Sequence, residues 1–158
     1  MNSTILSQLI NLTSQAGEII MNLRANSANY SIKTDNTPVT SADKASHELI
    51  VNTLQKLTPD IPILSEESSH IPFLTRQSWN EYWLIDPLDG TRDFIDGSPD
   101  FCISIALIRD KYPIFGLIYS PFNKTHYYRL ENNSSIKLFN KTTFEILSTK
   151  PKRWEKIV

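Results

Sequence analysis

The sequence predicts an α+β fold, in which two long helices pack on a mainly antiparallel sheet. In the first third of the chain, apolar residues recur every three or four positions, which is typical of amphipathic helices. From residue 82 onward, short apolar and aromatic segments follow one another, with short polar turns between them. Turns of this length join antiparallel neighbours, because parallel strands need a longer crossover. Helices followed by an antiparallel meander of strands indicate the α+β class.

Two helices are expected before residue 60. The first covers residues 4–24, and its apolar face consists of Ile5, Leu9, Leu12, Ala16, Ile19 and Leu23. Residues 26–36 are polar and are interpreted as a loop or short strand. Ser41 is the expected N-cap of the second helix, which ends at Pro59. The residues that this helix would bury are Ala45, Leu49, Leu54 and Leu57.

The expected strands begin with residues 61–64 and continue as a meander. Its strands are predicted over residues 82–85, 101–108, 114–119, 126–130, 136–139 and 144–147. Cys102 lies in an apolar run and is therefore assigned to core packing. The histidines show no spacing typical of metal ligands, so all three are expected to be structural or exposed: His47, His70 and His126.

The bulk composition limits the class of protein. The chain has 158 residues, of which 40% are hydrophobic and 21% charged, as in one ordinary globular domain. A formal net charge of −1 gives no electrostatic case for nucleic acid as a partner. No transmembrane segment or secretory signal is evident. A single cysteine fits a reducing compartment, so we expect the cytoplasm, with peripheral attachment to the inner membrane as an alternative.

Carboxylates gather where two of the expected strands end. Glu66 and Glu67 follow the first strand, and Asp86 and Asp89 follow the second in the segment Asp-Pro-Leu-Asp-Gly-Thr. Unpaired carboxylates beside a core are costly, so their position indicates a purpose. Across a Pro-containing turn, both aspartates can reach one ion, and Leu88 can add its carbonyl. Mg²⁺ prefers such oxygen ligands and suits phosphate chemistry, so the segment predicts a metal-dependent phosphate enzyme.

The residues that follow these aspartates suit a phosphate group. Gly90 permits close approach of the backbone, and the N–H groups of Gly90 and Thr91 could hold phosphate oxygens if a helix begins there. Structural alternatives remain open for the acids. Asp-Gly is a common turn dipeptide, and Glu66 with its neighbour is also typical of a surface loop. Asp43 would be favoured in the first turn of a helix by the helix dipole alone.

Two other motifs fail on spacing. An EF-hand loop needs alternating acids with glycine at its sixth position and glutamate at its twelfth, which residues 86–91 do not provide. Haloacid-dehalogenase-like phosphatases carry Asp-x-Asp-Gly-Thr and use the first aspartate as a nucleophile. The present segment is one residue longer, which would misplace the second acid. Direct attack by a metal-activated water is therefore the expected chemistry.

Together these motifs resemble the inositol monophosphatase superfamily of lithium-sensitive, Mg²⁺-dependent phosphatases. The matching segments are Pro-Val-Thr-Ser-Ala-Asp at 38–43, Ser-Glu-Glu at 65–67 and Asp-Pro-Leu-Asp-Gly-Thr at 86–91. Within the superfamily, the chain is most similar to the bacterial CysQ-type 3'(2'),5'-bisphosphate nucleotidases. These have a basic residue, an acid and Phe after Gly-Thr, as at residues 92–94 here, where inositol monophosphatases usually have Thr-Asn-Phe.

The resemblance implies a role for each matching residue. The implied metal ligands are Glu66, Asp86, the carbonyl of Leu88, and Asp89. The implied substrate-binding residues are Glu66, Leu88, Asp89, Gly90 and Thr91. The implied catalytic residues are Asp43, Thr91 and Glu66. In this scheme Asp43 orients Thr91, which helps to activate the attacking water.

The implied reaction is removal of the 3'-phosphate from adenosine 3',5'-bisphosphate by two Mg²⁺ ions and water, giving AMP and phosphate. The implied fold is the N-terminal half of a layered αβαβα sandwich. Residues 1–150 would form the metal- and phosphate-binding domain, and residues 151–158 the truncated start of a C-terminal domain.

The family also has a metal-binding Trp-Asp motif, to which Trp154-Glu155 does not correspond. We therefore expect an impaired enzyme, and either a dimer or a partner that supplies the missing half. The alternatives are an inositol monophosphatase-like enzyme and a non-catalytic, metal-binding remnant of the family.

Overall fold

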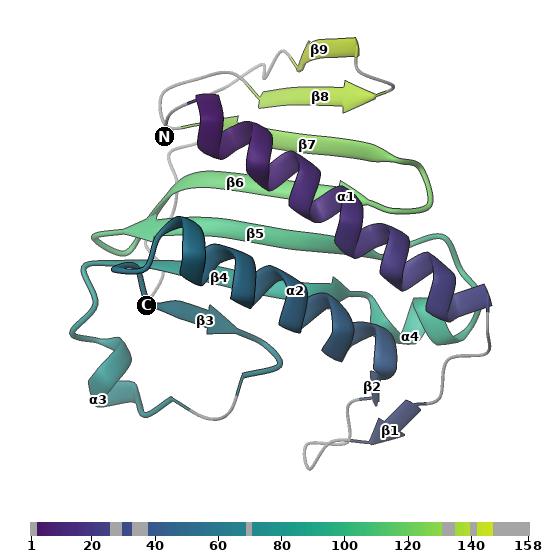
Figure 1. The fold of residues 1–158 in the computed structure, drawn as a ribbon, viewed down its shortest axis with the longest axis horizontal. Coiled ribbons are helices and arrows are strands. Elements are labelled where there is room, and N and C mark those ends of the chain that lie inside the picture. Colours follow the sequence, from purple (N-terminus) through teal and green to yellow (C-terminus); the bar gives the residue numbers. More distant parts are fainter. Residues whose placement is uncertain are drawn as a thin grey trace.

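The computed structural model describes residues 3–25, 30–32, 38–68, 71–130, 135–139 and 142–146. Within these ranges the helices are α1 (Ser3–Ala25), α2 (Ser41–Leu57), α3 (Phe73–Arg76) and α4 (Thr91–Ile95). The strands are β1 (Tyr30–Ile32), β2 (Pro38–Thr40), β3 (Ile63–Ser65), β4 (Glu81–Asp89), β5 (Cys102–Arg109), β6 (Tyr112–Ser120), β7 (Thr125–Leu130), β8 (Ser135–Phe139) and β9 (Thr142–Ile146). Figure 1 shows α1 and α2 side by side on one face of the larger sheet. The predicted α+β class is confirmed.

The larger sheet has the strand order β3-β4-β5-β6-β7-β8-β9 in the described part of the chain. Neighbouring strands from β4 to β9 are antiparallel, as the short polar turns predicted. In contrast, β3 lies parallel to β4. The chain between them includes α3 and is long enough for a parallel crossover. β1 and β2 pair separately as a small antiparallel sheet, so the polar segment 26–36 does include a short strand.

Helix α1 covers the predicted range and packs one face against the sheet. Its buried residues are Leu9, Leu12, Thr13, Ala16, Gly17 and Ile20. Ile20 is fully buried whereas Ile19 is half-buried, so the face is slightly rotated from the predicted one. Ile5 and Leu23 pack at the margin of the core.

Helix α2 differs from its prediction at the N-terminus and in its buried face. The N-cap is Thr40, not Ser41, because the Thr40 hydroxyl accepts hydrogen bonds from the N–H groups of Ala42 and Asp43. The Asp43 carboxylate accepts from the Thr40 N–H at 2.8 Å, which completes a capping box. The buried face of α2 also differs from the predicted one. The buried residues of α2 are Ala42, Asp43, Ser46, Ile50 and Leu54, whereas Ala45, Leu49 and Leu57 are half-buried.

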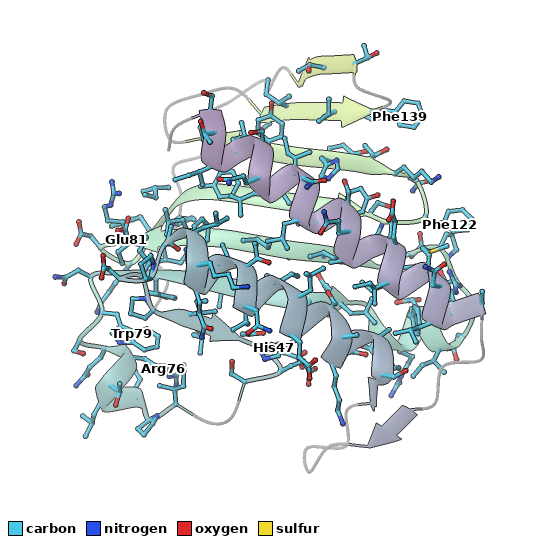
Figure 2. The ribbon with its side chains drawn as sticks, in the orientation of Figure 1. His47, Arg76, Trp79, Glu81, Phe122 and Phe139 are labelled. Carbon is cyan, nitrogen blue, oxygen red and sulfur yellow. The ribbon has the colours of Figure 1, made fainter. Side chains whose placement is uncertain are left out.

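The structure places two of the three histidines. His126 is buried on β7, where its Nε2 lies 3.1 Å from Thr13 Oγ1, in agreement with a structural role. His47, labelled in Figure 2, is half-buried on α2 and contacts Ser65. The predicted features that lie outside the described residues are His70, the strand end at 147, the segment 151–158 and Trp154-Glu155. No helix within the described residues is long and apolar enough to cross a membrane.

Candidate metal and phosphate site

The site begins at the carboxyl end of β4, which runs further than the sequence predicted. The segment from Asp86 to Asp89 is not a turn but the bulged end of the strand. Asp86 lies opposite Ser104 on β5 and Asp89 lies opposite Cys102, so β4 uses three steps where β5 uses two. A bulge accommodates the extra residue and changes the direction of the side chains that follow it.

The parallel pair β3 and β4 brings a second acid to the same sheet edge. Ser65 lies opposite Ile85, and the N–H of Glu66 donates to the Ile85 carbonyl at 3.0 Å. Glu66 therefore follows β3 at the level where Asp86 follows Ile85 on β4. The carboxyl ends of parallel strands meet at one edge of a sheet, which explains this proximity. The two acid-bearing segments predicted from sequence are thus brought together.

Asp86 lies in a strongly negative environment. Its pKa is raised from the usual 3.8 to about 6, chiefly by burial and further by the charges of Asp89, Glu66 and Asp43. The N–H of Leu88 donates to Asp86 Oδ1 at 3.2 Å and opposes this shift. The charges of several acids therefore act on Asp86, and a cation bound beside it would offset this repulsion.

The Asp43–Thr91 pair joins α2 to the start of α4. Thr91 Oγ1 lies 2.9 Å from Asp43 Oδ1 and 3.1 Å from the carbonyl oxygen of Leu88. Asp43 is fully buried, and its other oxygen, Oδ2, accepts hydrogen bonds from Thr40. Because one carboxylate oxygen is held by the N-cap of α2, the other is fixed in its direction toward Thr91. The structure therefore brings these residues together from 48 positions apart.

Gly90 allows the chain to turn sharply from β4 into α4. Its φ is +91°, in the left-handed region that favours glycine. A Cβ at this position would lie 2.8 Å from the Asp100 carbonyl oxygen and 3.2 Å from Phe101 Cα. Helix α4 then begins at Thr91, so the condition for the expected backbone cradle, a helix starting at this point, is met.

Sequence reasoning missed two residues around the site. Ser46 donates to the Pro87 carbonyl at 2.8 Å and ties α2 to the bulge. His47 Nδ1 lies 2.9 Å from Ser65 Oγ, beside Glu66. The spacing of Ser46 and His47 from Asp43, three and four positions along a helix, was the signal that could have identified them.

Cys102 was wrongly assigned to the core. It is half-buried, and its thiol donates to Asp89 Oδ2 at 3.8 Å. On β5, residues 103, 105 and 107 are buried against the helices. The two-residue period of a strand places Cys102 on the opposite face, with Ser104.

These residues fit a hard divalent cation. Within the described ranges, no three His, Cys, Asp or Glu side chains by themselves form a group that could hold a metal ion. Mg²⁺ does not need such a cage, because it usually retains several waters and binds one or two carboxylates together with phosphate oxygens. The acids around Asp86 supply the negative charge for such a site. The Leu88 carbonyl, which lies 3.1 Å from Thr91 Oγ1, belongs to the bulge between Asp86 and Asp89.

Known proteins are similar to this chain in sequence and in fold. A family model described as the inositol monophosphatase family matches residues 1–152. The 3'(2'),5'-bisphosphate nucleotidase CysQ of Aggregatibacter actinomycetemcomitans is 41% identical over 133 residues, covering 84% of this chain and 49% of that protein. The chain spans about half the length of the curated relatives it matches.

Solved structures agree with this assignment. CysQ from Bacteroides thetaiotaomicron is 34% identical, with a TM-score of 0.69, over 83% of this chain and 47% of that one. An IMPase/NADP phosphatase solved with Mg²⁺ and phosphate is 22% identical, with a TM-score of 0.74. The match covers 85% of this chain and 50% of that chain, and it shows the shared fold alone. The resemblance read from the sequence is confirmed. The chain belongs to the inositol monophosphatase family.

Proposed function

We propose that this chain carries the metal- and phosphate-binding machinery of a Mg²⁺-dependent 3'(2'),5'-bisphosphate nucleotidase. The reaction would be hydrolysis of adenosine 3',5'-bisphosphate to AMP and phosphate. Water would form a new bond to phosphorus while the bond to the 3'-oxygen breaks, and a proton would pass to that oxygen. The names of the relatives at about 40% identity support this choice of substrate.

The acids at the edge of the sheet would hold the metal. The proposed ligands are Glu66, Asp86, the Leu88 carbonyl and Asp89. Bound Mg²⁺ would offset the charge of the phosphate and make water a better nucleophile. Asp89, Gly90 and Thr91 would hold the phosphate itself, because the turn at Gly90 leads directly into α4 and the N–H groups at the start of a helix can bind an anion.

Thr91 and Asp43 would act on the attacking water. With the Thr91 hydroxyl hydrogen directed to Asp43 Oδ1, a lone pair of Oγ1 remains to accept a hydrogen bond from water. Asp43 is buried and fixed by Thr40, so Thr91 is oriented before substrate binds. Glu66, at the more exposed side of the site, would assist the same water. This fixed Asp43–Thr91 pair beside the acids is the observation that carries the proposal.

The test measures binding and turnover of the full 158-residue chain. Mg²⁺ is titrated by calorimetry, and phosphate release is followed with adenosine 3',5'-bisphosphate. We expect Thr91→Val to leave Mg²⁺ binding in place and reduce turnover, and Asp86→Asn to abolish Mg²⁺ binding. Asp93→Asn, which removes an exposed acid of α4, is the matched control and should change neither.

Three outcomes separate this function from its alternatives. Faster release of phosphate from inositol monophosphate than from the bisphosphate nucleotide would favour an inositol monophosphatase. Mg²⁺ binding without turnover on either substrate would favour a non-catalytic, metal-binding role. Absence of Mg²⁺ binding by a folded chain would refute the proposed site.

A further inference from the structure

The guanidinium group of Arg24 links the end of α1 to the segment that follows α4. Arg24 Nη2 donates to the Ser98 carbonyl at 2.7 Å. Its Cζ lies 5.0 Å from the ring centroid of Phe101 and 5.7 Å from that of Phe94. A planar, permanently charged group suits this combination of ring stacking and hydrogen bonding better than an ammonium group does. We call Arg24, Phe94, Ser98 and Phe101 the Arg24 clamp.

The two aromatic rings of the clamp pack against each other in the core. Phe94 and Phe101 pack edge to face with their centroids 5.5 Å apart, and both are almost fully buried. Phe94 belongs to α4, whereas Phe101 immediately precedes β5. Arg24 therefore contacts both ends of the loop that joins α4 to β5.

This pair of rings packs directly against the proposed phosphate turn. The space where a Gly90 side chain would lie is taken by the Asp100 carbonyl oxygen and by Phe101, at 2.8–3.3 Å from an added Cβ. From the other side, the Phe94 N–H donates to the Gly90 carbonyl at 2.9 Å. A shift of Phe94 or Phe101 would therefore move the backbone of Gly90.

Hydrogen bonds within the loop between α4 and β5 connect its residues to one another. The Ser98 N–H donates to the Asp93 carbonyl at 2.9 Å, and the Asp100 N–H donates to Ser98 Oγ at 3.1 Å. Gly97 permits the sharp turn with a φ of +85°. Because these hydrogen bonds connect the residues of the loop, the hydrogen bond from Arg24 to the Ser98 carbonyl also restrains the positions of Asp100 and Phe101.

We propose that Arg24 is a positioning residue for the phosphate turn. It fixes α4 and the loop after it against the carboxyl end of α1, and thereby holds the backbone N–H groups of Gly90 and Thr91 in place for an anion. The proposal rests on the proposed function insofar as the anion is a phosphate; the mechanical link between Arg24 and Gly90 does not depend on it.

The test compares Arg24→Ala and Arg24→Lys with wild type. Lys56→Ala is the matched control, because it removes another basic residue from the last turn of a helix, at an exposed position. The first readout is the amide NMR signals of Gly90 and Thr91. We expect Arg24→Ala to shift or broaden both signals, Arg24→Lys to do so less, and Lys56→Ala to leave them unchanged.

The second readout is the affinity for inorganic phosphate in saturating Mg²⁺. We expect a roughly 5- to 20-fold loss in Arg24→Ala, because only part of the energy of the two lost cation–π contacts and the lost hydrogen bond acts on the phosphate turn, with partial recovery in Arg24→Lys. If wild type binds no phosphate, the proposed function fails and the amide signals alone decide the role of Arg24. Unchanged Gly90 and Thr91 signals in Arg24→Ala, or changes no larger than in Lys56→Ala, would overturn the inference. If Arg24→Ala does not fold, the same comparison is made with Arg24→Lys.

Discussion

At the scale of single residues, Asp86 opposes the stability of the metal-free protein. Its pKa in the folded chain is about 6, above the usual 3.8 of the unfolded chain. Between these values the folded state binds the proton more tightly than the unfolded state does. The contribution of Asp86 to the free energy of unfolding is therefore most favourable below pH 4 and decreases as the pH rises to 6. Ionised Asp86 therefore lowers the stability of the metal-free fold at neutral pH.

Asp86→Asn should accordingly stabilise the metal-free chain at neutral pH. We expect its melting temperature in EDTA at pH 7.5 to exceed that of wild type, and the difference to vanish near pH 4. Addition of Mg²⁺ should raise the melting temperature of wild type and not that of the variant. Thermal denaturation between pH 4 and 8 measures both effects. A variant less stable than wild type at pH 7.5 would contradict this account of Asp86.

His126 gives the opposite pH dependence. Its ring stacks on Tyr119 at 4.1 Å, and burial lowers its pKa from 6.5 to about 4, with the Ile10 backbone opposing the shift. Between pH 6.5 and 4 the unfolded chain takes up a proton that the folded chain does not, so stability falls as the pH falls.

His126→Gln should remove this dependence, because glutamine keeps polar groups for Thr13 and does not titrate. We expect wild type to lose more stability than the variant between pH 7 and pH 4.5 in urea denaturation. Because each protein's free energy of unfolding is compared with its own value at pH 7, any loss of stability that the substitution causes at every pH cancels. Equal losses in both proteins would show that His126 is not the group that titrates.

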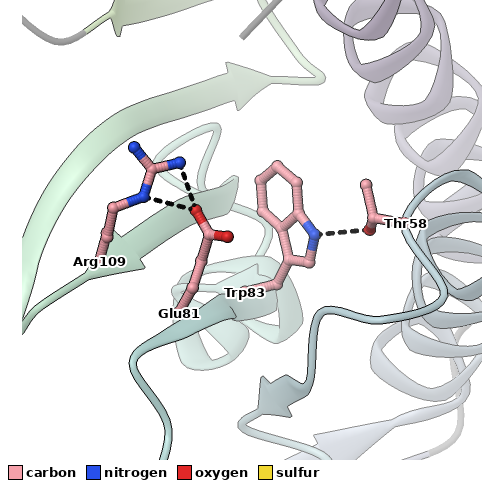
Figure 3. A network of polar contacts seen from close by, with 4 residues as sticks. All are labelled: Thr58, Glu81, Trp83 and Arg109. Atoms are coloured by element: carbon pink, nitrogen blue, oxygen red, sulfur yellow. Dashed lines mark hydrogen bonds and ion pairs between the residues drawn. The ribbon is translucent and has the colours of Figure 1, made fainter.

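At the scale of elements, α2 is anchored to β4 at both ends. Near its N-terminus, Ser46 donates to the Pro87 carbonyl. After its C-terminus, Thr58 Oγ1 accepts from Trp83 Nε1 at 2.9 Å, as Figure 3 shows. The same figure shows Arg109 and Glu81 paired between β5 and β4, with Nη2 and Oε1 2.7 Å apart. The tryptophan is buried, whereas the ion pair is largely open to solvent.

Thr58→Val should therefore destabilise the fold more than Glu81→Gln does. The first change leaves a buried indole N–H without its acceptor, which costs about 1–3 kcal/mol. The second weakens a solvent-exposed ion pair, which contributes about 0–1 kcal/mol. Urea denaturation of both variants gives the two free energies of unfolding. The opposite order would mean that the ion pair, and not the Trp83–Thr58 bond, holds this end of the sheet.

At the scale of the whole molecule, the helices α1 and α2 cover one face of the sheet (Figure 1). A groove of about 740 Å³ lies on the other face. It is lined by residues that lie opposite one another on neighbouring strands, among them Leu84, Ala106 and Gly116. Ile118 and Tyr127, a directly paired couple on this face, are 47% and 38% exposed. Apolar surface of this kind favours association.

We expect the chain to self-associate through this face, in line with the dimer anticipated from the sequence. The apparent mass in size-exclusion chromatography with light scattering should rise with concentration, and Ile118→Lys should lower it. Phe122→Lys is the control, because Phe122 is exposed in the turn after β6, away from the groove (Figure 2). A monomer at all concentrations would rule out this interface.

Much of the site could be predicted because its acids follow recognisable strands. Glu66, Asp86 and Asp89 were placed by the apolar segments before them, and Gly90 and Thr91 by the turn that their residue types indicate. The buried face of α2 was harder to predict. Its apolar residues suggested a stripe through Leu49, but the helix buries Asp43 and Ser46, whose side chains form hydrogen bonds there. A polar residue is buried where its hydrogen bonds are satisfied, and local periodicity does not contain that information.

The sequence by itself determined the class of fold, the order of the two long helices and of the main strands, and the family, because these follow from the periodicity of apolar residues and from local motifs. Only the tertiary structure decided how the site is assembled. The β4 bulge, the contact of Asp43 with Thr91, the place of Cys102 beside Asp89 and the reach of Arg24 to Phe101 all depend on strand register and on helix rotation. These are set by long-range packing, which joins residues far apart in the chain.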